Sequence, residues 1–350
     1  MLVALVITVG AALGGCGTLP VPVSGPPPQS ASSAAPSVPP GEPPHASPTG
    51  PQSAAPGAPS SPPDTRGGTP PAPGSGHPSG SPNTTPEPTS PPPPLDGFPT
   101  EASAGVPAGT KLETYRGPCL IDKDGTVLER VEVACDRLVI QAADVIIRSS
   151  RLPPVDVDGD GWSVTVEDSE IDGGEFVGPA IGYGNVTVRR SEIRGAQHSV
   201  LCGSNCLIES SLLHDQFLPT DEDWHNNGFL SNGGTGVRLT GNTISCTPVD
   251  NDAGGGCSGA ASFFGDFEPV SDVVIENNLI RATPGAFCVR LGYDPAKKFG
   301  PEADRVVVIG NIFDRGPTGQ CGGTGPVTSA PPGIRFEGNL WSDGQPVPVS

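Results

Sequence analysis

The sequence reads Gly184-Asn185-Val186-Thr187-Val188-Arg189-Arg190-Ser191-Glu192-Ile193 at the clearest copy of a pattern that recurs through its C-terminal two thirds. Two apolar residues stand at alternate positions, and a Ser or Asn, one spacer and a further apolar residue follow them. Alternation with a period of two is typical of a β-strand, in which Val186 and Val188 face one side and Thr187 and Arg189 face the other. The pattern therefore predicts a short strand that ends near a Ser or Asn.

Further copies of this pattern lie at 144–152, 162–171, 205–213, 236–244, 272–280, 305–313 and 333–341. The Ser or Asn of each copy, which we call the anchor, falls at Ser150, Ser169, Ser191, Ser211, Asn242, Asn278, Asn311 and Asn339. Successive anchors are 19, 22, 20, 31, 36, 33 and 28 residues apart. Repeats of this length that hold short strands are typical of a solenoid, in which stacked coils share one core.

The anchor fits a sharp corner between strands. Asn tolerates left-handed backbone geometry, and both Ser and Asn can bond the local backbone or stack into a ladder. An aromatic content of 5% and a single Met agree with a narrow interior filled by aliphatic side chains. We therefore predict an all-β fold, a right-handed parallel β-helix of about nine coils, over residues 111–350.

Two of the repeats carry a resemblance to a known family. They read Val-Thr-Val-Arg-Arg-Ser-Glu-Ile at 186–193 and Val-Val-Ile-Glu-Asn-Asn-Leu-Ile at 273–280. The chain resembles the pectate-lyase-like β-helix superfamily, in the version found in secreted and lipid-anchored bacterial proteins, over about residues 111–350. The resemblance implies the fold and leaves the chemistry open, because the superfamily includes polysaccharide lyases, glycoside hydrolases, uronate epimerases and non-catalytic adhesins.

The first residues form an apolar run that ends at Leu13-Gly14-Gly15-Cys16, which resembles a bacterial lipobox. The run is too short for an ordinary membrane-spanning helix. The resemblance implies that residues 1–15 are a signal peptide and that Cys16 carries the lipid, so the protein is expected at the extracellular face of the cell membrane. A plain secretory signal with an incidental cysteine is the alternative, since no Lys or Arg precedes the apolar run.

Residues 16–110 are dominated by Pro, Ser, Gly, Ala and Thr, and prolines 91–94 are consecutive. Such a segment has too few apolar residues to bury, so we predict a disordered, partly polyproline-II tether between Cys16 and the β-helix.

The formal net charge of −19 disfavours a nucleic-acid partner, because such proteins neutralise phosphates with basic residues. A polysaccharide or cell-wall glycan is the expected partner, the membrane is contacted through the lipid alone, and a monomer is expected.

Eight cysteines follow Cys16, and an even count in an exported protein implies disulfides. Proximity in sequence suggests the pairs Cys119–Cys135, Cys202–Cys206, Cys246–Cys257 and Cys288–Cys321, although eight cysteines allow many other pairings. A zinc site is the alternative, and the scattered spacing disfavours it.

The anchor steps of 31, 36 and 33 residues leave room for long loops on three neighbouring coils. Loops inserted at matching places lie side by side and can wall a groove. His225 lies in the polar stretch 221–228, and His198 precedes the equivalent strand of the coil before. We predict that a sugar is held here by His198, Asp223, Trp224 and Asn226, together with Asp266 from the next coil.

A group of cations follows at Arg290, Lys297 and Lys298, beside Tyr293. Lyases and epimerases of uronates need a cation for the carboxylate, a base for the C5 proton and, in lyases, an acid for the leaving oxygen. We assign Arg290 or Lys297, His225 and Tyr293 to these roles. A surface loop solvated by its charges is the alternative, and a hydrolase is less favoured because no spacing singles out a carboxylate pair.

The stretch 156–161 reads Asp-Val-Asp-Gly-Asp-Gly, and Glu167 follows, which fits a calcium-loop pattern in full. Its flanks are strands and not the helices of an EF-hand. Asp156, Asp158, Asp160 and Glu167 are therefore candidate ligands of a calcium ion, the only cofactor expected. An Asp- and Gly-rich turn between coils is the alternative.

Together these features predict a carbohydrate-active surface protein with lyase or epimerase chemistry on a uronate-containing polysaccharide. A non-catalytic wall-associated binding or structural protein is the alternative, since no catalytic signature is present.

Overall fold

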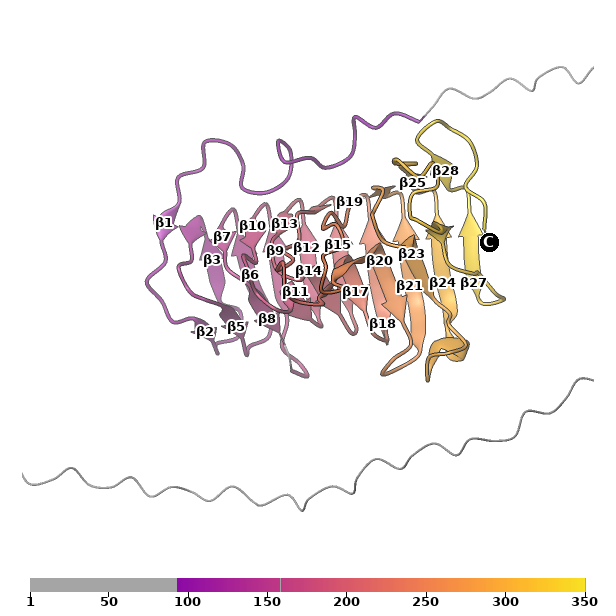
Figure 1. Cartoon of the computed structure of the whole chain (residues 1–350). Helices are drawn as coiled ribbons and strands as arrows, with labels where there is room; N and C mark the ends of the chain where they lie inside the picture. The colour runs from indigo at the N-terminus through magenta and orange to yellow at the C-terminus, as the bar shows by residue number, and fades with distance from the viewer. Residues whose placement is uncertain (1–92, 158, 350) are drawn as a thin grey trace, which may run out of the picture. The chain divides into compact units, whose positions relative to one another are not determined.

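The computed structural model describes residues 93–157 and 159–349, which belong to one compact unit. They form a right-handed parallel β-helix (Figure 1), as the repeats predict. Each coil contributes one strand to each of three parallel sheets, A, B and C. The described residues supply ten strands to sheet A and nine each to sheets B and C, which agrees with about nine coils.

Sheet A consists of β1 (Glu113–Thr114), β4 (Val131–Glu132), β7 (Arg151–Leu152), β10 (Glu170–Asp172), β13 (Glu192–Arg194), β16 (Leu212–Leu213), β19 (Thr243–Ile244), β22 (Leu279–Ile280), β25 (Ile312–Phe313) and β28 (Leu340–Trp341). Sheet B consists of β2 (Leu120–Ile121), β5 (Leu138–Ile140), β8 (Val155–Val157), β11 (Pro179–Tyr183), β14 (His198–Cys202), β17 (His225–Ser231), β20 (Gly256–Phe264), β23 (Phe287–Gly292) and β26 (Gly325–Val327). Sheet C consists of β3 (Val127–Glu129), β6 (Val145–Arg148), β9 (Val164–Glu167), β12 (Val186–Arg189), β15 (Cys206–Glu209), β18 (Gly234–Thr240), β21 (Val270–Glu276), β24 (Asp304–Ile309) and β27 (Ile334–Glu337). A short 3₁₀-helix, η1 (Gly300–Glu302), lies before β24.

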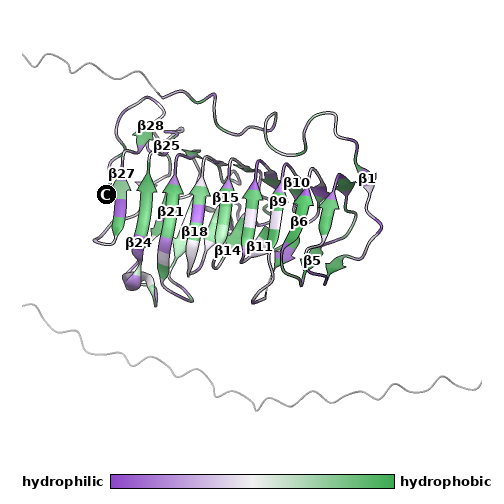
Figure 2. Ribbon diagram, turned by 180° about the vertical axis from the view of Figure 1, so that it is seen from behind, coloured by the Kyte–Doolittle hydropathy of each residue, from purple (hydrophilic) through white to green (hydrophobic). Residues whose placement is uncertain are grey.

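The core is built from the alternate apolar positions of the repeat. Val186 pairs in register with Val164 and Cys206 on the neighbouring coils, and Val188 pairs with Val166 and Ile208. All of these side chains are at most 2% exposed. Of the strands of sheet C, β21 and β24 are largely apolar in Figure 2. Because each strand hydrogen-bonds to the coils on both sides, one narrow apolar column runs the length of the stack.

The anchors form the predicted ladder at the corner between sheets C and A. Each anchor's backbone N–H donates to the side-chain oxygen of the next anchor, at 2.9 to 3.1 Å, from Ser150 through to Asn339. The left-handed residue is the one before the anchor, as at Arg190 (φ 49°) and Asn277 (φ 55°). The anchor is therefore important for its buried, hydrogen-bonded side chain. The residue before it adopts the left-handed backbone conformation that the turn requires.

The folded body begins earlier than the sequence predicts. Residues 93–112, which we call the strap, run along the outer face of sheet A towards β1 (Figure 1). Thr243 Oγ1 donates to the Pro99 carbonyl at 2.7 Å, and the Gly105 N–H donates to the Arg190 carbonyl at 3.1 Å. The part of the predicted tether from residue 93 to 110 thus packs against the coils.

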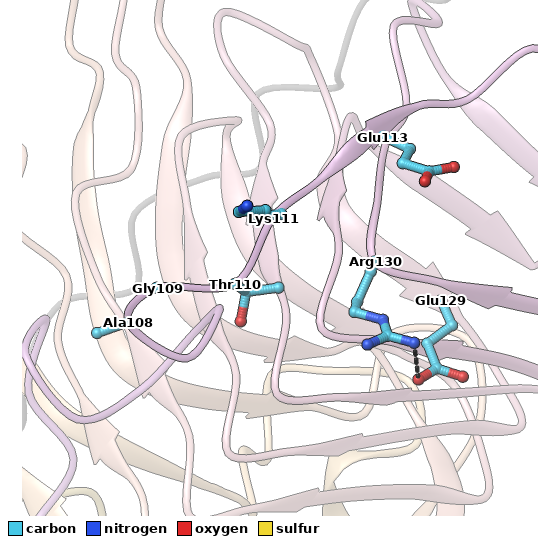
Figure 3. Close-up of a pocket in the computed structure, with 7 residues that line it drawn as sticks. All are labelled: Ala108, Gly109, Thr110, Lys111, Glu113, Glu129 and Arg130. Atoms are coloured by element: carbon cyan, nitrogen blue, oxygen red, sulfur yellow. Dashed lines mark ion pairs between the residues drawn. The ribbon is translucent and has the colours of Figure 1, made fainter.

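A recess of about 750 Å³ lies where the strap meets the first coil (Figure 3). Its walls are the strap residues 108–111 together with Glu113, Glu129 and Arg130, and Arg130 pairs with Glu129 at 3.5 Å. None of the residues that the sequence singles out for catalysis lines this recess.

All four predicted disulfides are present, with sulfur atoms 1.96 to 2.08 Å apart. Cys288–Cys321 joins neighbouring coils, whereas Cys202–Cys206 closes a loop within one coil. Nowhere in the described ranges is there a helix long and apolar enough to cross a membrane. Residues 1–15 and Cys16 lie outside those ranges, as does the tether up to residue 92.

Candidate functional site

The candidate site is the outer face of sheet B over β14, β17, β20 and β23. In these strands Phe229, Ala261 and Val289 are buried in the core. Since side chains alternate along a strand, their neighbours Leu230, Ser262 and Arg290 face outwards. Leu230 pairs with Ser262, and Ser262 pairs with Arg290, so the three residues form one row across three coils. Leu230 and Ser262 are buried, and Arg290 is the partly exposed member of the row.

Arg290 is a half-buried cation held between aromatic rings. Its guanidinium carbon lies 5.5 Å from the ring centre of Phe264 and 5.3 Å from that of Phe287. Its Nε donates to the Ser258 carbonyl at 3.3 Å. Within the described part of the chain, no carboxylate lies within 4.0 Å of its nitrogens. Burial lowers the pKa of Arg290 and the charge of Asp294 acts in the opposite direction, but a guanidinium stays charged in a protein, so a partly exposed positive charge without a direct ion pair is present here.

The Phe264 ring also contacts Lys297, which therefore lies near Arg290. The Lys297 ammonium lies 5.3 Å from the Phe264 ring centre and pairs with Asp266 Oδ1 at 2.8 Å. The predicted grouping of Arg290 and Lys297 is therefore present, but the charge of Lys297 is already balanced by Asp266. Arg290 is left as the cation available to an acidic ligand.

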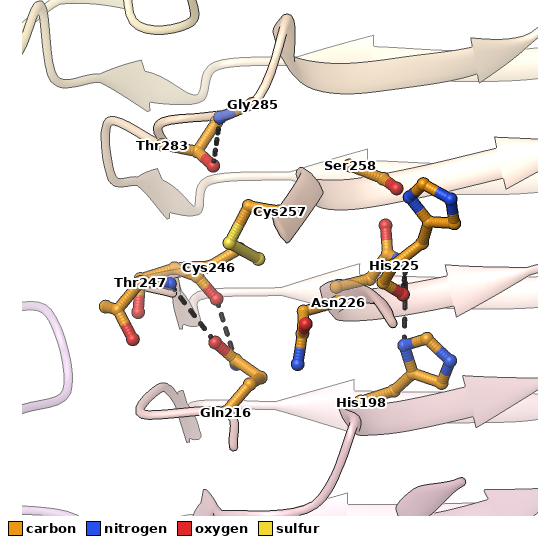
Figure 4. Close-up of a disulfide and its surroundings, with 12 residues drawn as sticks. His198, Gln216, His225, Asn226, Cys246, Thr247, Cys257, Ser258, Thr283 and Gly285 are labelled. Carbon is orange, nitrogen blue, oxygen red and sulfur yellow. Dashed lines mark hydrogen bonds between the residues drawn. A yellow bond between two sulfur atoms is a disulfide. The ribbon is translucent and has the colours of Figure 1, made fainter. Parts of the chain in front are cut away.

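The two predicted histidines stand on neighbouring strands of the same sheet (Figure 4). His198 pairs in register with Asn227, and His225 begins β17, where it lies beside Ser258. The Ser258 carbonyl accepts the hydrogen bond from Arg290. The side chains of His225 and Arg290 therefore both lie near the backbone of β20 at Ser258. His225 is exposed and accessible to a ligand.

His198 is buried and pairs with an amide. Only 5% of the residue is exposed, and its Nδ1 lies 3.4 Å from Asn227 Nδ2. Burial lowers the pKa of His198 to about 4, so the ring is neutral at neutral pH. Asn227 Oδ1 and Ser262 Oγ are buried without a hydrogen-bond partner among the described residues.

His198 is expected to make the fold sensitive to acid. Its pKa is about 4 in the folded state and 6.5 in a free chain, so unfolding takes up a proton as the pH falls through this interval. Stability is complete above pH 6.5 and falls by about 3 kcal/mol as the pH approaches 4. Urea titrations at several pH values in this interval should show that the free energy of unfolding falls less steeply with decreasing pH in His198→Gln than in the parent protein. Equal slopes would contradict the assignment of this pH dependence to His198.

Four other predicted residues have structural roles or stand apart from the row. Asn226 turns away and donates from Nδ2 to the carbonyls of Gln197 and Phe217, at 3.0 and 2.7 Å. Trp224 packs edge-on against Phe217, with ring centres 6.1 Å apart. Tyr293 packs against the core, and Asp223 is exposed on the loop before β17. The structure therefore brings Arg290, Lys297, His198 and His225 to sheet B and leaves Tyr293 without a visible role as the acid.

The candidate calcium ligands are engaged elsewhere. Asp156 lies on β8, where its Oδ2 pairs with Arg137 at 2.9 Å. Glu167 ends β9 and lies between the guanidinium groups of two neighbouring coils, at 3.4 and 3.3 Å. Asp158 lies outside the described residues.

A different group of possible metal ligands lies close together. Over the described ranges, Glu101, His214 and Asp215 are the only three His, Cys, Asp or Glu side chains with ligand atoms all within 4.8 Å of one another. Asp156, Asp160 and Glu167 do not form such a group, so calcium binding stays a prediction. The sequence did not point to this group, because Glu101 falls in the segment predicted to be a tether.

The positions of Phe264 and Phe287 beside Arg290 were also missed. Phe264 stands in an aromatic stretch that the sequence shows, but the spacing alone does not tell which rings flank Arg290. Comparisons with protein family models, with curated proteins and with solved structures return no match.

Proposed function

We propose that the protein is a carbohydrate-active β-helix protein that binds a uronate-containing polysaccharide on the outer face of sheet B. The observation that carries this proposal is Arg290, a half-buried cation between two aromatic rings with no carboxylate partner in the described part of the chain. A uronate offers both a carboxylate for the guanidinium and a sugar face for the rings of Phe264 and Phe287.

The physical reason is desolvation. A charge that is partly removed from water without a partner is costly, and a bound carboxylate offsets that cost. Guanidinium and carboxylate also pair through two parallel hydrogen bonds, which fixes the orientation of the sugar ring.

The proposed reaction is the removal of the C5 proton of the uronate. Arg290 stabilises the charge that spreads into the carboxylate, and His225 accepts the proton. In a lyase the C–H electrons form the C4–C5 double bond while the C4–O bond breaks, and the leaving oxygen takes a proton from His225. In an epimerase no bond to C4 breaks, water donates a proton to C5 from the opposite face, and the proton held by His225 passes to the resulting hydroxide.

Arg290→Ala is expected to weaken the binding of oligogalacturonate by about 10- to 100-fold, since hydrogen bonds to charged groups contribute about 1.5–3 kcal/mol. The measurement is a calorimetric titration of the purified protein. Arg335→Ala is the matched control, because Arg335 is exposed on sheet C and pairs with Glu337. Equal affinities of the two variants would overturn the assignment of the binding face.

Catalysis is tested separately from binding. His225→Ala should abolish the ultraviolet absorbance of the unsaturated product and leave the thermal melt unchanged. If no uronate polymer yields product or exchanges its C5 proton with solvent while Arg290 is still required for binding, the protein is a non-catalytic glycan-binding protein. That second function is favoured by the neutralised Lys297 and by Tyr293, which packs against the core.

The proposed location is the extracellular face of the cell membrane, through a lipid on Cys16 and a signal peptide at residues 1–15. Four disulfides support an exported protein, because such bonds persist in oxidising compartments. Radiolabelled palmitate incorporated into the parent protein but not into Cys16→Ala would test the anchor.

A further inference from the structure

A second cluster of polar side chains lies on the outer face of sheet A, beneath the strap. Glu101 comes from the strap, and His214 and Asp215 follow β16. His214 is buried, with Nε2 2.9 Å from Glu192 Oε1 and Nδ1 3.0 Å from Asp215 Oδ2. A groove of about 490 Å³ adjoins the cluster and is lined by both Glu101 and His214.

Glu192 orients the imidazole. The Glu192 side chain is only 15% exposed, because Gly105 of the strap lies over it. A Cβ atom added at Gly105 would lie 3.3 Å from the Glu192 side chain. Nε2–H donates to this carboxylate, which turns Nδ1 towards Asp215 and Glu101. Histidines that bind metals are held in this way, with one ring nitrogen on the metal and the other donating to a carboxylate.

The charges of the cluster do not balance. Glu101, Glu192 and Asp215 surround His214, which supplies at most one positive charge when protonated. Two arginines lie nearby, and both pair with other carboxylates. Arg281 in the groove pairs with Asp314 at 3.5 Å, and Arg194, whose charge also acts on Glu192, pairs with Glu170 and Asp172 at 2.8 Å. A divalent cation on Nδ1 supplies more positive charge to the three carboxylates than a single proton does.

We propose that Glu101, His214 and Asp215 bind a divalent transition-metal cation of the Zn²⁺ type, with Glu192 as the positioning residue of His214. One imidazole nitrogen and two carboxylate oxygens suit zinc, whereas calcium prefers oxygen ligands alone. Three protein ligands leave a fourth tetrahedral position for water. The site is distinct from the uronate site on sheet B and does not depend on it.

The bound metal links the strap to the coil that ends with β16. Glu101 lies between the two points where the strap already bonds to the sheet, at Pro99 and Gly105. Its backbone is therefore held near His214 before metal binds. An ion that binds the folded chain and not the unfolded one raises the stability of the folded state.

The test is a calorimetric titration of ZnCl₂ into the full chain after removal of metals with a chelator, with CaCl₂ in a parallel series. One tight zinc site is expected, and Glu101→Gln, Asp215→Asn and His214→Ala should each weaken it by at least about tenfold. Glu113→Gln is the matched control, because Glu113 is an exposed glutamate just beyond the strap. The same zinc affinity in Glu101→Gln as in the control, or tighter binding of calcium, would overturn the proposal.

A spectroscopic measurement keeps the proposal testable if a variant folds poorly. Zinc K-edge absorption of the parent protein should show one imidazole in a shell of nitrogen and oxygen ligands. A shell with no imidazole, or with more than one, assigns the zinc to other residues and contradicts the site. Far-ultraviolet circular dichroism of Glu101→Gln is expected to match the parent, since Glu101 lies on the surface.

Discussion

Asn311→Ala should lower the free energy of unfolding by about 4 kcal/mol, because it leaves several buried polar groups without partners at once. Asn311 Nδ2 donates to the Ile275 carbonyl at 2.8 Å and to Asn339 Oδ1 at 2.9 Å. Its Oδ1 accepts from the backbone N–H and the Nδ2 of Asn278, both at 2.9 Å. The residue is fully buried, so water cannot replace these bonds.

Urea denaturation followed by circular dichroism measures this loss. Asn311→Ser is the matched variant, because serine already occupies the ladder in earlier coils and there its Oγ accepts the N–H of the preceding anchor. Serine at 311 is expected to lose roughly half as much stability as alanine, since it keeps that acceptor. A cost below about 1 kcal/mol for alanine would show that the ladder contributes little.

Loss of the Cys288–Cys321 disulfide should destabilise the protein more than loss of Cys202–Cys206. The two pairs are 33 and 4 residues apart in sequence, and closing a longer loop removes more entropy from the unfolded chain. The loop-entropy model gives about 4 kcal/mol for the longer loop and about 2 kcal/mol for the shorter. All four cysteines are at most 2% exposed, so the packing lost on substitution is similar.

The comparison uses the double variants Cys288→Ala/Cys321→Ala and Cys202→Ala/Cys206→Ala under the same non-reducing conditions. The difference between their unfolding free energies isolates the effect of loop length. Equal losses, or a larger loss for Cys202–Cys206, would mean that strain or residual structure outweighs the constraint on the unfolded chain.

Much of the fold was predictable because the same core packing and the same anchor hydrogen bonds recur in successive coils. The alternation of Val186 and Val188 specified the core face, and the anchors specified where each coil turns. Cys288 and Cys321 stand at the same distance in sequence from the anchors Asn278 and Asn311, ten residues after each, which placed them on neighbouring coils. The left-handed residue before each anchor was not predicted, because its identity varies from Arg190 to Asn277 and carries no common signal.

The site was predictable only in part, because outward-facing side chains have no repeating pattern. Because His198 precedes the strand equivalent to the one that follows His225, stacking predicts that it lies near Asn226 or Asn227, and it pairs in register with Asn227. Stacking did not reveal that Asp266 neutralises Lys297 or that Tyr293 packs inwards. The strap was missed because its composition continues that of the preceding proline-rich chain, and the cluster at Glu101 was missed with it.

The path of the strap has a mechanical consequence. Leu95 and Phe98 share a groove with Leu279 of β22, while the strap ends at β1 on the first coil. A pulling force applied at residue 93 therefore acts first on contacts at β22, the eighth of the ten described strands of sheet A. These contacts break one after another and release about 60 Å of extended chain before the first coil bears load. Detachment of the strap thus relieves tension while the three sheets stay intact.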